Sequence, residues 1–143
     1  MIRVEVRGIP APQGSKRHVG GGRMIEMSKR VGPWRDAVRG EAQRAMGGAP
    51  PLGGPLAVDV FFYLPRPKGH YRTGRNAGQL RPAAPAVPCS APDIDKLARA
   101  VLDGLTEGGA WKDDGQVAVL TVVKRYADSI APGCSVRIAP ADE

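Results

Sequence analysis

A helical pattern between two strand patterns is the feature that most constrains the fold of this chain. Apolar side chains recur at helical spacing between residues 93 and 108, and they form a single stripe of Ile94, Leu97, Ala98, Val101 and Leu105. Such a stripe needs an apolar surface to cover. Residues 55–64 before it and 116–127 after it are rich in the β-branched and aromatic residues that favour strands. A sheet built from these strands would supply that surface.

The other segments extend this unit into a single domain. A chain of 143 residues is long enough to bury one hydrophobic core. A second helical pattern starts at Trp34, with Gly32-Pro33 marking its beginning and Gly47-Gly48 its end. Strand patterns occupy residues 2–7, 55–64, 116–127 and 134–140. The order of elements predicts one α/β domain over residues 1–143, with a small mixed sheet packed by two main helices.

The strand patterns also suggest places within the sheet. We expect residues 55–64 to form a central strand, residues 116–127 a buried strand and residues 134–140 an edge strand. Residues 65–92 show no apolar period and are rich in proline, glycine and basic residues. We interpret this segment as a long, mobile loop, and loops of such length inside compact domains are usually functional or disordered.

Four aspartates flank the helical pattern, although the chain carries a formal net charge of +7. Asp93 and Asp95 stand at its start, and Asp113 and Asp114 follow its end. Each has a structural explanation, as a helix cap, as a favourable charge in the first turn of a helix, or as part of a turn. One cap and one turn do not require four carboxylates. Grouped carboxylates also bind Mg²⁺, which can activate water for attack on phosphorus.

The positive charge points to a polyanionic partner such as nucleic acid. Arg99 lies one helical turn after Asp95. The two residues form either an ordinary ion pair on a helix or a group in which arginine stabilises negative charge building on a phosphate.

Several other classes of protein are not indicated. No run of about 18 apolar residues is present, so we expect no membrane-spanning segment. The two cysteines, Cys89 and Cys134, are far apart and have little histidine company, so they predict neither a zinc site nor a disulfide. Nothing in the sequence indicates an organic cofactor.

The segment "PDIDKLARAVLDGLTEGGAWKDDGQV", residues 92–117, closely resembles the signature of the RusA-type Holliday junction resolvases. That signature consists of D-x-D, a helix with a basic residue, and then D-D-x-Q-V. The segments "IPAPQGSKR" and "WRDAVRGEA" are also similar to that family, and the likeness is weak only between residues 65 and 90.

The resemblance implies a homodimeric, Mg²⁺-dependent endonuclease that nicks two strands symmetrically across a four-way DNA junction, with Mn²⁺ able to substitute for Mg²⁺. It also implies a cytoplasmic enzyme of a bacterium, phage or prophage. Asp93, Asp95 and Asp114 match the metal-binding aspartates, and Asp113 matches a supporting acid. Arg99 stands where known members have an essential lysine, and arginine and lysine are not interchangeable.

Basic residues away from the acids are candidate DNA contacts. A surface that reads DNA by shape and backbone charge needs such residues rather than many aromatic ones. The candidates are Lys16, Arg17, Arg23, Lys29, Arg30, Lys68, Arg72, Arg75, Arg81 and Lys96.

Two other functions remain open on the sequence. One is a related nuclease that prefers flaps, forks or other branched DNA. The other is a binding module for branched DNA without catalytic activity, in which the acids would be caps and turns.

Overall fold

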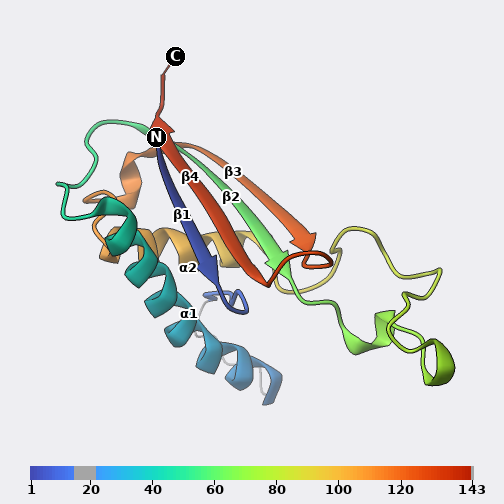
Figure 1. The fold of residues 1–143 in the computed structure, drawn as a ribbon. Helices are drawn as coiled ribbons and strands as arrows, with labels where there is room; N and C mark the ends of the chain where they lie inside the picture. Colours follow the sequence, from blue (N-terminus) through green and yellow to red (C-terminus); the bar gives the residue numbers. More distant parts are fainter. Residues whose placement is uncertain (15–21, 143) are drawn as a thin grey trace.

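The computed structural model describes residues 1–14 and 22–142, and residues 22–28 by their backbone alone. It is one domain made of a four-stranded mixed sheet and two helices (Figure 1). This confirms the fold class predicted from the sequence. The strands are β1 (Ile2–Arg7), β2 (Leu56–Leu64), β3 (Val117–Tyr126) and β4 (Gly133–Pro140), and the helices are α1 (Gly22–Met46) and α2 (Ile94–Glu107).

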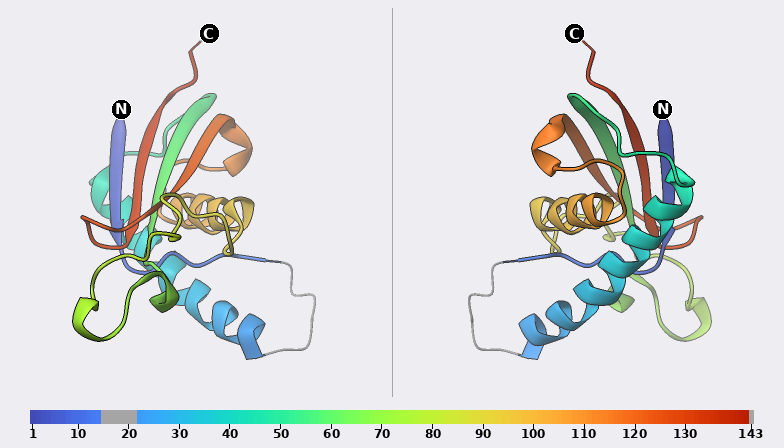
Figure 2. Two further views of the ribbon diagram at one scale, coloured as in Figure 1. Left: turned by 90° about the vertical axis from the view of Figure 1, so that its right-hand side faces the viewer. Right: turned by 90° about the vertical axis from the view of Figure 1, so that its left-hand side faces the viewer.

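The strands follow the order β1-β4-β2-β3 across the sheet. β4 pairs antiparallel with both β1 and β2, whereas β3 pairs parallel with β2. Parallel neighbours need a crossover connection, and α2 is part of the one between β2 and β3. The side chains of β2 alternate between fully and partly buried, because α1 and α2 cover one face of the sheet (Figures 1 and 2).

Two expectations about the sheet are wrong. Residues 134–140 belong to an interior strand, because β4 returns between β1 and β2 and is paired on both sides. Residues 116–127 belong to the outer strand β3 instead, and Val119 and Leu120 are 52% and 41% exposed. Residues 116–127 are the richer of the two in β-branched residues, yet they form the outer strand, because composition does not reveal which neighbours a strand has.

The predicted start of the first helix is also wrong. α1 begins at Gly22, and Pro33 lies inside it. Proline removes one backbone donor, but its fixed φ is compatible with a helix. The residues before Gly32 include Met, Glu, Lys and Arg, which favour helices, so the helix extends past the proline in the N-terminal direction.

Close packing between the helices fixes the position of α2. A Cβ atom on Gly104 would lie 2.7 Å from Val38, and one on Gly108 would lie 2.6 Å from Ala42. Only glycine allows this approach of the two backbones. The stripe predicted for α2 is largely confirmed, because Leu97, Ala98, Val101 and Leu105 are buried whereas Ile94 is 40% exposed.

The loop between β2 and α2 extends away from the sheet (Figures 1 and 2) but carries its own hydrogen bonds. It contains the two short 3₁₀ turns η1 (Lys68–His70) and η2 (Gly74–Asn76). The backbone N–H of Arg72 donates to the Gln79 carbonyl, and that of Arg81 donates to the His70 carbonyl. The loop is therefore more regular than the sequence indicated.

Arg66 attaches the base of this loop to the end of β3. Its guanidinium donates to both carboxylate oxygens of Asp128, at 2.7 and 3.0 Å, and to the Pro85 carbonyl, and it lies 4.1 Å from the centre of the Tyr126 ring. The hydrogen bond from Arg66 lowers the pKa of the Asp128 carboxyl below its usual value.

In the described part of the chain, no helix has both the length and the apolar character needed to cross a membrane.

Candidate active site

Asp93 occupies the residue just before α2, but its carboxylate does not cap the helix. No hydrogen bond runs from its side chain to the backbone of the first turn. The carboxylate lies 3.4 Å from Lys96 Nζ instead, and both side chains are largely exposed. An exposed pair of this kind contributes little to stability. The capping explanation for Asp93 is therefore not supported, and its carboxylate is accessible to a ligand.

Asp95, Arg99 and Asp114 line one open cleft between α2 and β3. Its volume is about 500 Å³, and its other walls are apolar. Asp95 and Arg99 come from the first two turns of α2, whereas Asp114 belongs to the short 3₁₀ turn η3 (Asp114–Gln116) that leads into β3. The apolar lining consists of Ile94, Ala98, Leu102, Leu120 and Val122. Asp95 and Asp114, which are 19 positions apart in the sequence, thus line the same depression.

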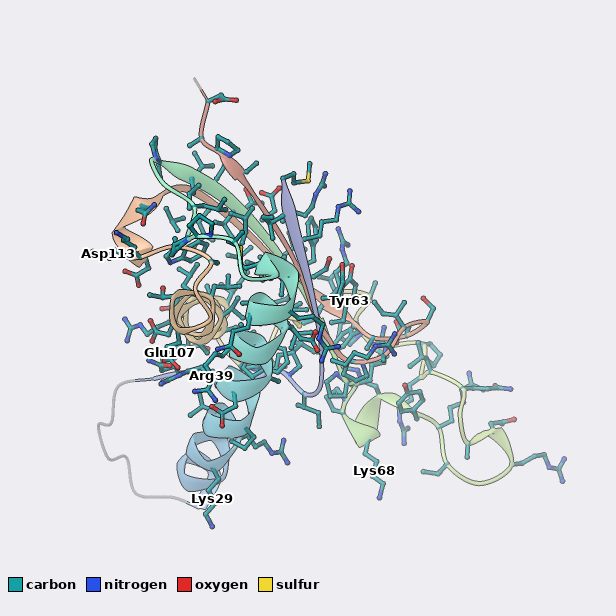
Figure 3. The ribbon with its side chains drawn as sticks, turned by 60° about the vertical axis from the view of Figure 1, so that its left-hand side comes forward. Lys29, Arg39, Tyr63, Lys68, Glu107 and Asp113 are labelled. Carbon is teal, nitrogen blue, oxygen red and sulfur yellow. The ribbon has the colours of Figure 1, made fainter. Side chains whose placement is uncertain are left out.

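A dense set of hydrogen bonds holds the turn that carries Asp114. The Asp113 carboxylate accepts from the Gly115 N–H at 2.9 Å, and the Gln116 side chain accepts from the backbone N–H groups of Lys112 and Asp113. These reciprocal bonds form a capping box. The Asp113 carboxylate therefore stabilises the turn, where Figure 3 shows this residue. The supporting role of Asp113 in the reaction stays a prediction.

Gln116 also ties this turn to the segment before β2. Its amide group donates to the Leu52 and Gly54 carbonyls, at 3.0 Å each. The residue was not among the predicted site residues, although it is the glutamine of the D-D-x-Q-V signature. A polar residue next to two aspartates was the available signal, but its partners 62 and 64 residues away could not be deduced from it.

The N-terminal segment after β1 lies against α2. The backbone N–H of Gln13 donates to the Lys96 carbonyl at 3.0 Å, and its side chain donates to Asp103 at 2.6 Å. Arg35 of α1 donates to the Gln13 side chain and pairs with Glu107. The "IPAPQG" part of the N-terminal motif is therefore in contact with the helix that bears Asp95 and Arg99.

The candidate DNA contacts that the structure describes come from three elements. Lys29 and Arg30 are exposed on α1, Lys96 lies on α2 beside Asp93, and the others are exposed in the loop of residues 65–92. Figure 3 shows Lys29 and Lys68 projecting outward. Lys16 and Arg17 lie outside the described residues, as does the side chain of Arg23. The loop members are Lys68, Arg72, Arg75 and Arg81.

The donor set of the cleft fits Mg²⁺. Among the described side chains, no three His, Cys, Asp or Glu residues are close enough together to hold a metal ion without other ligands. Mg²⁺ does not need such a cage, because proteins usually bind it through one or two carboxylates together with waters and substrate phosphates. Asp95 and Asp114 offer two carboxylates in the same cleft, and Asp93 stands two residues before Asp95.

One comparison with known proteins decides the family. The family described as Endodeoxyribonuclease RusA matches residues 5–139, nearly the whole chain. The chain belongs to the RusA endodeoxyribonuclease family. Membership implies the DNA-cleaving activity of a Holliday junction resolvase. No individual curated protein matches the sequence significantly.

Proposed function

We propose that this RusA family member is a Mg²⁺-dependent endonuclease that resolves four-way DNA junctions by paired, symmetrical nicks. The observation that carries the proposal is the shared cleft of Asp95, Arg99 and Asp114. Within the described part of the chain, neither carboxylate is engaged in a side-chain hydrogen bond or an ion pair that would explain its presence structurally.

Each charged residue of the cleft has a role in the proposed reaction. Asp95 and Asp114 would hold Mg²⁺, and Mn²⁺ would fit the same oxygen donors. Asp93 does not line the cleft but stands two residues before Asp95, and we propose that it supplies a third carboxylate when metal and DNA are bound. The bound metal would lower the pKa of a water molecule and polarise the phosphate. Arg99 would stabilise the negative charge that develops on the phosphate oxygens. A guanidinium keeps its proton, so Arg99 would act through its charge and not as a proton donor.

Basic residues outside the cleft would bind the DNA backbone. They lie on α1, on α2 and in the loop of residues 65–92, so they could contact more than one arm of a junction. Phosphate contacts of this kind position a duplex without reading its sequence. The exposed loop lysine and arginines would then recognise the shape of the junction rather than its bases.

We also propose that the enzyme acts as a twofold dimer. A four-way junction has approximate twofold symmetry, and paired nicks require two active sites. The outer strand β3 supports this proposal, because in the described part of the chain it pairs with β2 alone and it bears exposed Val119 on the face opposite to the cleft. Exposed apolar residues on a strand edge are suited to pairing with another chain.

The substitution Asp95→Asn tests the catalytic role of the cleft. We expect junction cleavage to fall by at least about 10²–10³-fold, a loss typical of removing one key electrostatic group. Junction affinity in EDTA should stay the same or rise, because a negative charge is removed from a DNA-binding surface. Asp36→Asn, which removes an exposed carboxylate from α1, is the matched control and should cleave normally. Cleavage by Asp95→Asn at the wild-type rate would refute the proposal.

A further inference from the structure

A lysine of β3 holds the segment that leads into α2. Lys124 Nζ donates to the Ser90 carbonyl at 2.8 Å and to the Pro92 carbonyl at 2.9 Å. The Pro92 carbonyl belongs to the peptide bond that joins Pro92 to Asp93. Lys124 therefore acts on the backbone directly before the first candidate metal ligand, from a strand 31 residues further along the chain.

The position of Lys124 is unusual for a charged residue. β2 and β3 are paired in parallel, and Lys124 lies opposite Phe62, which is fully buried. Lys124 therefore lies on the helix-covered face of the sheet, in line with Val122 and Tyr126. An apolar side chain would be expected there from the alternation of the strand. The two carbonyl partners account for a lysine at this position, since a half-buried ammonium needs acceptors.

In the described part of the chain, no further hydrogen bond from a side chain reaches residues 86–92. Within the described part of the chain, no backbone–backbone hydrogen bond involves residues 86–92. The Asp93 side chain does not cap α2, and its pair with Lys96 is exposed. The Asp93 carbonyl accepts from the Leu97 N–H at 3.0 Å, which ties Asp93 to α2. The two bonds from Lys124 hold the residues just before it, up to the Pro92–Asp93 peptide.

We propose that Lys124 is a positioning residue for DNA cleavage, which places Asp93 by fixing the Pro92–Asp93 peptide. The inference rests on the proposed nuclease function, in which Asp93 is a metal ligand. Lys124 itself contacts neither the metal nor the scissile phosphate in this account. Removing its ammonium should free the segment and misplace the carboxylate, and a displacement of about 1 Å at an active site can reduce a rate about 10²-fold.

The test compares Lys124→Met, which keeps the apolar stem, with Lys124→Arg, which keeps a cationic donor. Arg125→Met removes a charge from the neighbouring, exposed position of the same strand and is the matched control. Three quantities are measured for each protein. They are the single-turnover cleavage rate at saturating junction and Mg²⁺, the junction Kd in EDTA, and hydrogen–deuterium exchange of peptides that cover residues 89–97.

For Lys124→Met we expect the cleavage rate to fall about 10–100-fold. The junction Kd should stay within about twofold of wild type, because only the cleavage step is affected. Exchange should become faster in residues 89–97 and not elsewhere. Lys124→Arg should restore most of the rate, and Arg125→Met should behave as wild type. If Lys124→Met does not fold, Lys124→Gln replaces it, since its amide stays polar but its side chain is one bond too short to keep both hydrogen bonds.

Three results would overturn the inference. They are a wild-type cleavage rate in Lys124→Met, a weaker Kd with an unchanged cleavage rate, and unchanged exchange in residues 89–97. The second result would make Lys124 a DNA contact. A wild-type protein that cuts no junction would instead refute the proposed function and the catalytic consequence inferred here. The exchange measurement would still decide whether Lys124 holds the segment.

Discussion

Gln116→Leu is the substitution whose effect on the candidate site can be estimated best from the structure. The Gln116 side chain makes four hydrogen bonds, of which two stay within its own turn and two join η3 to the segment before β2. Three of them are exposed to solvent, so water replaces part of what is lost. At roughly 0.5 kcal/mol for each exposed bond and about 1 kcal/mol for the part-buried one, the substitution should lower the free energy of unfolding by about 2–3 kcal/mol. For a domain of 143 residues, this corresponds to a decrease in Tm of roughly 7–10 °C.

The assay is thermal unfolding followed by circular dichroism, with Gln43→Leu as the matched control. Gln43 is exposed on α1, so its substitution should change the free energy of unfolding by less than about 0.5 kcal/mol. Well below the Tm, Gln116→Leu should also cleave junctions more slowly while it binds them normally, because the turn that carries Asp114 is loosened. A Tm within about 2 °C of wild type would refute this estimate of the network. Normal cleavage despite the lower Tm would show that the turn does not position Asp114.

Three further outcomes follow from other parts of the chain. Replacing Lys16 and Arg17 with alanine should weaken junction binding and reduce the slope of log K against log salt by up to about 2. If the variant binds the junction as tightly as wild type at several salt concentrations, neither residue contacts the DNA. Exposed Cys89 should react with iodoacetamide in the native protein whereas Cys134 should not, because burial raises the pKa of the Cys134 thiol, and mass spectrometry of the labelled peptides checks this. The lowered pKa of Asp128 means that its ion pair stabilises the fold above the usual carboxyl pKa and that this contribution is lost as the pH falls through the lowered value. Asp128→Asn should therefore be less stable than wild type at pH 7, and the difference should shrink toward pH 3.

The fold was predictable where local pattern and burial agree. The apolar stripe of α2 has a clear helical period and lies against the core. β2 was correctly expected to be central, since it is paired on both sides. The places of β3 and β4 were not predictable from composition, because the strand richer in β-branched residues, β3, is the outer one, and the place of a strand depends on its neighbours. The start of α1 was mispredicted because proline next to glycine usually marks a boundary, whereas here the helix continues through Pro33.

The sequence predicted the types of residue in the candidate site but not the residues that hold them in place. The signature pointed to Asp93, Asp95 and Asp114, and the structure places Asp95 and Asp114 on one cleft that Asp93 does not line. It did not point to Lys124, whose carbonyl partners are 32 and 34 residues away in the sequence, or to the carbonyl partners of Gln116, which are 62 and 64 residues away. Such partners depend on how the crossover places α2 and β3 relative to each other. Sequence spacing holds no information on that placement.

We propose above all that the cleft cuts branched DNA with the help of a divalent metal. The most direct test is cleavage of an end-labelled four-way junction by the wild-type protein, beside a linear duplex and a flap of the same sequence, in Mg²⁺ and in EDTA. The account predicts paired nicks at symmetrical positions in the junction, little cutting of the other two substrates, and no cutting in EDTA. Tight binding of the junction without any nick in Mg²⁺ or Mn²⁺ would contradict the account and favour a binding module.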